Sequence, residues 1–513
     1  MEVKNVTTRD AVEPERGKLT RRSVLQRSVA LLAGAGALSG LLACTGGSLT
    51  AAPTAAPAKP TASGSAPART VSSPASQPAS GSSTGNSQLV WLVPEDPLID
   101  KYAKEAIIPA FEKQYSGVKV QAITPGSTAY GQKLLTLVAA GQVPDVFCTW
   151  GGSSFFLLWN HKLLGDLTPH FQSAKIDPSY IQDVYRGEYS VEGHLYGVPW
   201  NSNPTFLVYN KSIFDKYGVP LPPSDWKDKT WTVDKLVETA KALTHTTGNP
   251  STSVWGLTMG AGTCGSLAWL WGADPFNDKG GPTDSPVYRG KPLTAVFPDR
   301  PEIIQAMSWL ADLTLKHHVS PTPTDAQALS SYGNPIFSGH IAIAEQAAGW
   351  LERQAAVVQP KFDWGVAPFP YGPAGVNTSQ REDTAWYLAS QSKNADAAFN
   401  LIVYATQGQG ADDLITVAKD NPPIKGDYFT KWSADILKIH GFAMNAEQFT
   451  SVFQGGIAAG FGDPQNVIDN ALEYMNAFNQ LMAPVWLGKI SAQEGLKQVK
   501  AKWEEVLKTS GTS

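Results

Sequence analysis

Tryptophan rings and short polar side chains at expected strand ends and chain crossovers are the residues of this sequence best suited to binding chemistry. The rings predicted to stack on a ligand are Trp150, Trp200, Trp269, Trp271, Trp350 and Trp386. The side chains predicted to hydrogen-bond it are Glu95, Asp96, Ser153, Asn201, Asn203 and Asp383, and Tyr130 and Gly151 complete the predicted ligand-binding set. An aromatic ring stacks on the C–H face of a sugar, and convergent donors and acceptors bond its hydroxyls. The set therefore predicts a site for a hydroxyl-rich small molecule.

Several of these positions also have a structural interpretation. Trp269 and Trp271 stand two residues apart in an expected helix, where their side chains face different ways, so one of the two is expected in the core. Trp386 lies in an apolar strand, which equally suits a core residue. Carboxylates such as Glu95 and Asp96 are more often solvated surface groups. Core packing and surface solvation thus stay open as alternatives at these positions.

The sequence predicts no catalytic residue, no metal site and no cofactor. It contains no GxSxG or HExxH motif, and its three cysteines form no CxxC pair. Residues 260–265 match GxGxxG, which we interpret as a tight turn into a helix, because no acid ends a following strand at the required distance. The alternative class is a secreted carbohydrate-active enzyme, which would need two carboxylates facing each other across a cleft.

Alternating strands and helices are predicted to position the first group of candidates. Strands are expected at residues 89–93, 118–123 and 143–149, with helices at 99–115 and 130–140 between them. This order predicts a parallel sheet covered by helices. Ligands bind beyond the carboxyl ends of such strands, which is where Glu95 and Trp150 lie.

A second unit follows the same logic. Thr232 is the expected N-cap of a helix at 233–244, and Pro301 opens a helix that runs to residue 317. From residue 395 onward helices dominate, and the last is expected at 492–508. The expected strands of this unit are residues 205–209, 254–259, 341–344 and 364–367.

Cys44 ends the N-terminal segment in a pattern typical of bacterial export. Arg21 and Arg22 precede an apolar run at residues 29–43 that ends in Leu-Leu-Ala directly before the cysteine. These features predict a signal peptide at 1–43 of the twin-arginine type. The Leu-Leu-Ala-Cys ending resembles a lipobox, so Cys44 is the predicted lipidation site. A cleaved signal with an incidental cysteine is the alternative, whereas the run is shorter than the roughly 20 residues of a membrane-spanning helix.

Composition sets the domain plan beyond the signal. Residues 44–88 are mainly Ala, Pro, Ser, Thr and Gly and predict a disordered linker. The remaining roughly 420 residues exceed the size of a single core, so two lobes are expected. A net charge of −4 argues against nucleic acid as a partner. Cys148 and Cys264 are predicted to be buried free thiols, with a disulfide as the alternative.

Several short segments along the chain resemble segments of one known protein family. They are YGQKL at 130–134, GQVPDV at 141–146, YGVPW at 196–200, LVYNKSIF at 207–214, FSGHIAI at 337–343 with Gly349-Trp350, and SKN at 392–394. Their order and spacing resemble the extracellular solute-binding proteins of ABC importers, sugar-binding family 1 type, which include maltose-binding protein. The resemblance extends over residues 89–507.

The resemblance implies an α/β, two-lobed periplasmic-binding-protein-like fold of type II, in which each lobe has a mostly parallel sheet flanked by helices. The N-lobe would comprise residues 89–202 plus 368–420, and the C-lobe 203–367 plus 421–513. Crossings between the lobes are expected near 201–205, 368–373 and 421–424. Trp350 matches the stacking tryptophan of the family.

The resemblance also implies the function. The protein would capture a carbohydrate between its lobes and deliver it to the transmembrane subunits of an ABC permease, as a lipid-anchored monomer outside the cytoplasmic membrane. It would need no cofactor. Where relatives carry a glycine pair this chain has Glu382-Asp383, so a non-sugar solute in the same fold is one alternative. A pure adhesion or scaffold protein, which the linker would suit, is another.

Overall fold

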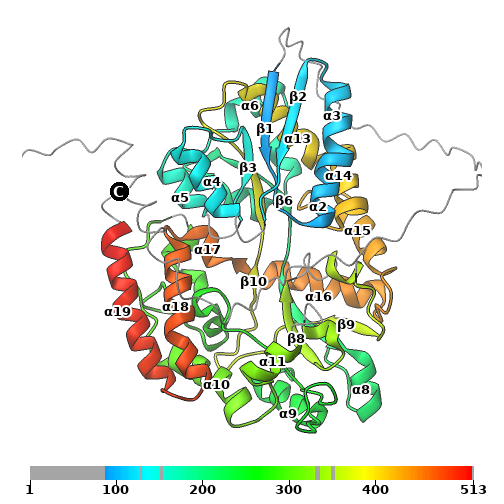
Figure 1. The fold of residues 1–513 in the computed structure, drawn as a ribbon, viewed down its shortest axis with the longest axis vertical. Coiled ribbons are helices and arrows are strands. Elements are labelled where there is room, and N and C mark those ends of the chain that lie inside the picture. Colours follow the sequence, from blue (N-terminus) through cyan, green and yellow to red (C-terminus); the bar gives the residue numbers. More distant parts are fainter. Residues whose placement is uncertain are drawn as a thin grey trace, which may run out of the picture.

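The computed structural model describes residues 87–126, 130–150, 154–289, 291–329, 335–347, 353–356 and 358–510. Within these residues the chain forms two α/β lobes joined by strands that run between them (Figure 1). Cys44, the predicted signal peptide and linker, Gly151, Ser153 and Trp350 all lie outside the described residues.

The N-lobe, the upper body in Figure 1, is built on a mixed sheet of strand order β2-β1-β3-β11-β6. Its strands are β1 Ser87–Leu92, β2 Val118–Ile123, β3 Val146–Cys148, β6 Gly197–Asn201 and β11 Thr384–Leu388. β1 pairs in parallel with β2 and β3, as the sequence predicts, whereas β11 runs antiparallel to β3 and β6. A strand from late in the chain therefore completes the sheet of the first lobe.

Helices flank this sheet because their apolar residues recur at helical spacing. The predicted helix at 99–115 is a continuous run of α2, a π-helical turn and α3, which buries Ile99, Tyr102, Ile107 and Phe111. The helical elements of the lobe are α2 Pro97–Lys101, η1 Tyr102–Ile107, α3 Ile108–Gln114, α4 Tyr130–Ala139, α5 Phe155–Asn160, α6 Thr168–Ala174, α7 Asp183–Glu188, α13 Ala395–Thr406, α14 Gly408–Asp413 and η9 Leu414–Ala418.

The C-lobe, the lower body in Figure 1, has a smaller sheet of order β8-β7-β9. Its strands are β7 Thr205–Asn210, β8 Ile343–Ala347 and β9 Trp364–Ala367. Its principal helices are α8 Lys211–Tyr217, α9 Val233–Leu243, η4 Thr263–Trp271, α10 Pro301–Leu315, α11 Pro323–Leu329, α16 Ala446–Ala459, α17 Pro464–Val467, α18 Ala471–Trp486 and α19 Ala492–Ser510. Thr232 caps α9 as predicted, since its side chain accepts from the Lys235 amide.

Two expectations for the sheets are wrong. β7 runs antiparallel to both of its neighbours, so the C-lobe sheet is not parallel. Residues 254–259 form no continuous strand, and only Trp255 and Thr258 make isolated bridges to the β8 region. The backbone at Gly256 lies so close to α9 that an added Cβ would stand 1.9 Å from the Ala240 carbonyl oxygen. The segment still pairs in parallel with residues 340–345 through the backbone of Trp255 and Thr258, so the pairing is interrupted at Gly256 rather than absent.

The first chain crossing lies between β6 and β7, at the predicted residues. The second lies at 380–384 rather than at 368–373, where β10 Gln380–Arg381 pairs with β12 Phe461–Gly462 before β11 joins the N-lobe. Tyr371 still belongs to the C-lobe, because it pairs with Thr232.

The third crossing is also displaced from its predicted place at 421–424. Ile424 pairs with Ile181 of the N-lobe, whereas Phe442 pairs with Trp364 of β9. The chain therefore changes lobes after α15 Tyr428–Ile436. Long-range pairing, which local sequence patterns do not encode, sets both displaced boundaries.

The cysteines confirm one further expectation. Cys148 and Cys264 are both buried and free, as predicted. Burial raises the pKa of the Cys148 thiol to about 12, which keeps it protonated and unreactive. Among the residues with described structure, no helix combines the length and apolar character needed to cross a bilayer.

Candidate functional site

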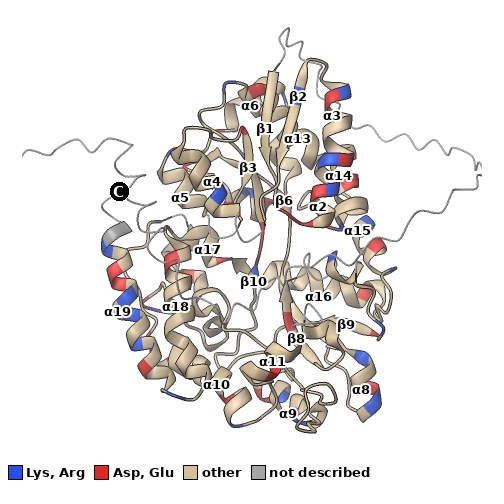
Figure 2. Ribbon diagram, viewed as in Figure 1, with Lys and Arg blue, Asp and Glu red and all other residues tan. Residues whose placement is uncertain are grey.

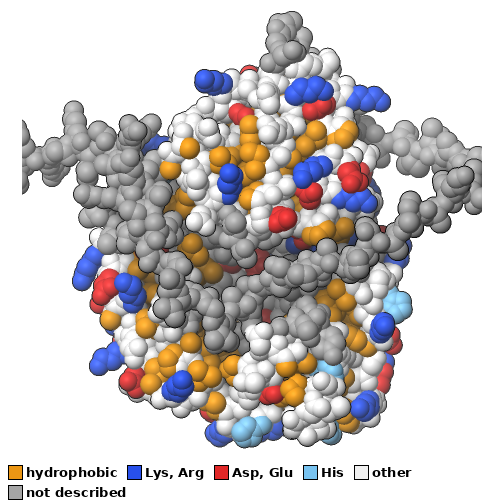
Figure 3. Space-filling model, in the orientation of Figure 1, with side chains coloured by type: hydrophobic (Ala, Val, Ile, Leu, Met, Phe, Trp, Pro, Cys, Tyr) orange, Lys and Arg blue, Asp and Glu red, His pale blue; other side chains and the backbone are white. Residues whose placement is uncertain are grey.

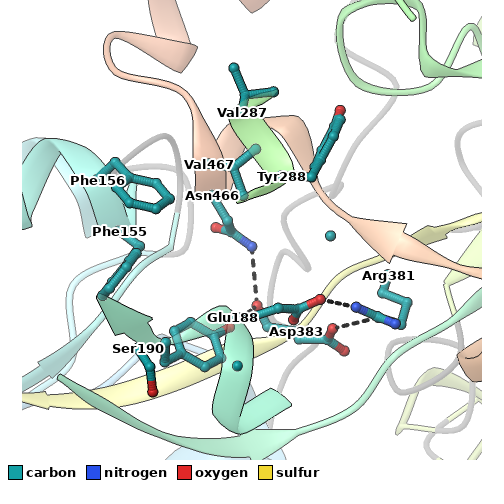
Figure 4. A pocket seen from close by; sticks show the side chains of 13 residues that line it. Phe155, Phe156, Glu188, Ser190, Val287, Tyr288, Arg381, Asp383, Asn466 and Val467 are labelled. Atoms are coloured by element: carbon teal, nitrogen blue, oxygen red, sulfur yellow. Dashed lines mark hydrogen bonds and ion pairs between the residues drawn. The ribbon is translucent and has the colours of Figure 1, made fainter. Parts of the chain in front are cut away.

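A cavity of about 170 Å³ opens where the two lobes meet the strand that joins them. The N-lobe contributes Phe155, Phe156 and Glu188, and the C-lobe contributes Val287, Tyr288, Asn466 and Val467. In Figure 4 the phenylalanine rings line one side, Val287, Tyr288 and Val467 the other, and charged groups meet at the far end. The cavity thus combines aromatic rings with polar groups, as a site for a small polar organic molecule requires.

Tyr288 lines this cavity with its ring. Its hydroxyl oxygen is buried and has no hydrogen-bond partner among the described residues. Burial, together with the charges of Asp274 and Asp463, raises the pKa of Tyr288 well above its usual value. The hydroxyl is therefore neutral, and it lies inside the protein rather than at the surface that a ligand in the cavity would touch.

Arg381 closes the charged end of the cavity and is fully committed to protein partners. Its Nε bonds Asp383 Oδ2 at 3.1 Å, and its Nη2 pairs with Glu188 (Figure 4). Its Nη1 donates to the carbonyls of Ile457 at 3.1 Å and Gly460 at 3.0 Å. Arg381 thereby ties the linking strand to both lobes, and it builds the wall of the cavity.

Asp383 holds the same junction from the other side. Its Oδ1 accepts from the Asn203 amide at 3.2 Å, and its backbone carbonyl accepts from Tyr189 Oη and Asn466 Nδ2. Burial raises the pKa of Asp383, and the Arg381 charge opposes that rise. Of the predicted ligand-binding residues that the structure describes, Asp383 alone lines the cavity.

Two carboxylates between the lobes form no ion pair among the described residues. Glu382 has an exposed side chain with no hydrogen-bond or ion-pair partner within the described part of the chain, and Glu345 of β8 accepts only from the Gly260 amide, at 2.8 Å. Protein atoms around Glu382, with the nearby charges of Asp463 and Glu345, raise its pKa to about 8, and burial raises that of Glu345 to about 7. Figure 2 shows acidic stretches at the linking strand and in β8, while lysines and arginines gather on outer helices such as α3, α8 and α19. The centre of the molecule is therefore acidic.

A second polar cluster lies at the carboxyl end of β1. Asp96 caps α2 by accepting from the amides of Leu98 and Ile99, and its Oδ2 also pairs with Arg353 Nε at 3.2 Å. Arg353 pairs in addition with the fully buried Asp420. Asp96 is thus a structural cap that has a cation partner.

The other predicted polar residues serve the junction of the strands. Asn201 is fully buried, and its Oδ1 accepts from the amide and hydroxyl of Thr384, which joins the ends of β6 and β11. Asn203 is buried and lies beside Asp383. Glu95 is exposed at the end of β1. The structure therefore brings Asn201, Asn203 and Asp383 together, while Glu95 stands apart.

Most of the described aromatic candidates lie in the core. Trp200 stacks on Trp386 with ring centroids 5.2 Å apart, and Trp91 meets Trp386 edge-on at 5.0 Å. All three are fully buried, so their large apolar area is spent on packing in this conformation. A core position was the alternative predicted for Trp386. Trp200 was predicted to stack on a ligand, and that prediction needs correction because its ring packs in the core.

The remaining aromatic predictions divide in the same way. Trp269 and Trp271 are both buried, although only one was expected in the core, because η4 is enclosed by protein on every side. Trp269 packs edge-on against Tyr288 at 5.7 Å and so supports the cavity wall. Tyr130 is a core residue whose hydroxyl donates to the Leu92 carbonyl and accepts from the Cys148 amide. Trp150 is half-buried against the N-lobe core.

Most residues of the cavity are absent from the predicted ligand-binding set. Phe155 and Phe156 lie a few positions after the predicted residues Trp150, Gly151 and Ser153, so proximity along the chain was a usable signal. Glu188, Tyr288 and Asn466 come from segments far apart in sequence, and only the folded chain brings them together. No group of His, Cys, Asp and Glu suited to a metal ion occurs among the residues for which structure is described.

Comparisons with known proteins agree with this architecture. The family model for bacterial extracellular solute-binding proteins matches residues 96–412. A probable ABC transporter-binding protein of Deinococcus radiodurans is 25% identical over 317 residues, which is 60% of this chain and 68% of that protein. The melibiose/raffinose/stachyose-binding protein MelE of Bacillus subtilis is 29% identical over 123 residues, 23% of this chain and 26% of its own.

Solved structures show the same fold. The ABC substrate-binding protein Lmo0181 from Listeria monocytogenes, in complex with cycloalternan, superposes with a TM-score of 0.67 at 21% identity, over 83% of this chain and all of that one. A maltose-bound MalE3 of T. maritima superposes with a TM-score of 0.60 at 19% identity, over 82% of this chain and 99% of its own. Both likenesses concern the two-lobed fold.

Proposed function

The chain belongs to the bacterial extracellular solute-binding protein family, and from that premise we propose that it captures a sugar or oligosaccharide between its lobes and delivers it to an ABC permease. The observation that carries this proposal is the cavity between the lobes, which is lined by the aromatic residues Phe155, Phe156 and Tyr288 and by the polar residues Ser190 and Asn466. Rings and convergent polar groups are the two kinds of partner that a sugar needs. Relatives named as sugar-binding proteins favour the same ligand class.

The signal to the permease would be the closed arrangement of the lobes. Domain closure bends a few chain crossings, and this chain crosses between its lobes in three places. A ligand that touches both lobes binds the closed state better than the open one, so it shifts the population toward closure. A permease that recognises the closed form would then distinguish loaded from empty protein. On this account the protein performs no chemistry on its ligand.

We place the protein outside the cytoplasmic membrane, as a monomer anchored by a lipid on Cys44. The twin-arginine segment and the lipobox support export and acylation. The face in Figure 3 carries acidic and basic side chains interspersed with apolar ones, with no field of a single sign. Such a surface offers no basic track for nucleic acid.

The second candidate function is capture of a non-sugar solute in the same fold. The observation that favours it is the pair of carboxylates, Glu382 and Glu345, neither of which forms an ion pair among the described residues. A solute with an amino group would neutralise them. A polyamine is the simplest probe of this possibility.

A thermal-shift screen of the purified protein tests the proposal. The panel contains melibiose, raffinose, stachyose and maltodextrins, with spermidine, amino acids and phosphate esters as non-sugars. A ligand that binds only the folded state raises the melting temperature as its concentration passes Kd. We expect a concentration-dependent rise with one sugar series, and loss of that rise in Trp350→Ala with the fold retained. A rise with non-sugars alone would contradict the sugar assignment.

A further inference from the structure

Arg353 is a buried cation that joins the two lobes. It follows β8 of the C-lobe, and its side chain is only 3% exposed. Its Nε pairs with Asp96 Oδ2 at 3.2 Å, and its Nη1 pairs with Asp420. Asp96 begins α2 at the end of β1, and Asp420 follows η9, so both acids belong to the N-lobe. The two ion pairs therefore cross the cleft.

Both acids are held in place by their own lobe. The Asp96 carboxylate accepts from the amides of Leu98 at 2.9 Å and Ile99 at 3.3 Å. Asp420 is 0% exposed, and its amide donates to the Leu414 carbonyl at 3.2 Å. A side chain that is already fixed loses little conformational freedom when it forms an ion pair, unlike a flexible surface group.

The geometry also shows what happens without the cation. With the lobes in this arrangement, loss of the guanidinium leaves two N-lobe carboxylates enclosed by protein with no positive partner. An uncompensated buried charge is strongly unfavourable. Opening of the cleft relieves it, because water then reaches both acids. The arginine therefore favours the closed arrangement over the open one, whereas an ion pair within one lobe would leave that balance unchanged.

We infer that Arg353 is a positioning residue for ligand capture, which draws the lobes together through Asp96 and Asp420 before the ligand binds. The effect on affinity rests on the proposed function, while the effect on lobe arrangement does not. When only the closed fraction binds, the apparent Kd is the intrinsic Kd divided by that fraction. A shift toward the open state therefore weakens binding without removing a ligand contact.

A distance measurement between the lobes tests this inference without knowledge of the ligand. Lys175 of the N-lobe and Lys241 of the C-lobe are both exposed, whereas Cys148 and Cys264 are buried, so in residues 87–513 Lys175→Cys and Lys241→Cys accept a pair of spin labels selectively. We expect the inter-lobe distance of the unliganded protein to lengthen in Arg353→Met and to recover in Arg353→Lys. The double variant Arg353→Met/Asp420→Asn should recover in part, because it removes one stranded carboxylate.

The control is Lys500→Met, because the pair of Lys500 with Asp299 lies within the C-lobe, with an Nζ–Oδ1 distance of 2.9 Å. It should leave the inter-lobe distance unchanged. An unchanged distance in Arg353→Met, in protein with a cooperative melting transition, would overturn the inference. If Arg353→Met does not fold, Asp420→Asn and the double variant carry the test, and equal distances in these and in the wild type overturn it.

A parallel titration with maltotriose and raffinose separates the two proposals. If either sugar binds, Arg353→Met should weaken it by about tenfold or more, and an unchanged Kd would overturn the role in capture. A longer inter-lobe distance in Arg353→Met with no sugar bound by any variant supports the role of Arg353 and counts against the sugar assignment.

Discussion

At the scale of single residues, the region between the lobes separates committed groups from available ones. Arg381 and Asp383 make their side-chain hydrogen bonds to protein partners. The Glu382 carboxylate is exposed and has no partner among the described residues. An exposed group without a partner is one that a ligand can satisfy, so Glu382 bears more on the specificity of the cleft than the buried tryptophans do.

Glu382→Gln should change how stability depends on pH. The protein atoms around Glu382 and the neighbouring carboxylates raise its pKa from 4.5 to about 8 in the folded protein. Between those values the folded state holds a proton that the unfolded chain has lost, so the stability of the wild type falls as pH rises. We expect the variant and the wild type to melt alike near pH 4.5, and the variant to melt higher above pH 8.

Glu192→Gln is the control for this experiment, because Glu192 is exposed in the turn between β4 Ser190–Val191 and β5 His194–Leu195. The measurement is the melting temperature of the wild type and of both variants across the pH range. Parallel curves for wild type and Glu382→Gln would refute the role assigned to this carboxyl.

Tyr130→Phe separates a core residue from a ligand contact. The hydroxyl of Tyr130 bridges the Leu92 carbonyl and the Cys148 amide, both at 3.0 Å, inside the N-lobe. Its removal leaves a buried donor and acceptor unpaired, which costs about 1–3 kcal/mol. Urea unfolding should show this loss while the affinity for any ligand stays unchanged. Weaker binding at full stability would instead return Tyr130 to the ligand-binding set.

At the scale of elements, the linking strand is the structural centre of the site. β10 pairs with β12, β11 completes the N-lobe sheet, and Glu382 between them donates its amide to the Asn203 carbonyl. Gly460 packs so closely on this strand that an added Cβ would stand 2.7 Å from Arg381 Cγ. A few residues of this strand therefore hold both lobes in position. A hinge at this place must combine stability with movement.

Arg381→Met should destabilise the whole protein. The substitution strands the buried Asp383 carboxylate and leaves the Ile457 and Gly460 carbonyls without their donor. Removing one partner of a buried pair typically costs about 3–5 kcal/mol. Calorimetry should show a large fall in melting temperature, and Arg186→Met, which breaks an exposed pair with Asp183, should show almost none. Equal effects in the two variants would argue against the central role of this strand.

Much of the fold was predictable from local pattern. β1, β2, α4 and α9 follow from alternation, helical spacing and the Thr232 cap, and these signals act within a few residues. The insertion of β11 between β3 and β6 was not predictable, because pairing between strands over 180 residues apart has no local signature. The crossings at 380–384 and after α15 were misplaced for the same reason.

The site was less predictable than the fold. The local sequence pattern is the same whether a tryptophan at a strand end faces the cleft or the core of the sheet. In the structure, Trp200 and Trp386 stack in the core. Arg353 follows the predicted Trp350 by three residues, yet its importance depends on Asp96 and Asp420, which are distant in sequence. Convergence of charges in space, rather than along the chain, decides which polar residues serve a site.

At the scale of the whole molecule, two lobes meet over a cavity, and a buried arginine spans them beside it. Family membership fixes the class of the protein as an extracellular solute-binding protein. Closure, recognition and delivery then depend on one equilibrium between open and closed lobes. The groups in the cleft would select the ligand. The Arg353 ion pairs would set how much of the ligand-binding free energy is needed to close the lobes.

The central claim is that a sugar binds in the cavity between the lobes. The most direct test is isothermal titration of the purified wild type, Phe156→Ala and Tyr288→Ala with melibiose, raffinose, stachyose and maltodextrins, with Tyr217→Ala as a matched control outside the cavity. The account predicts that one sugar series binds the wild type and the control alike, and binds both cavity variants at least about tenfold more weakly, equivalent to about 1.4 kcal/mol. Equal affinity of all four proteins for the sugar, or binding of non-sugars alone, would contradict it.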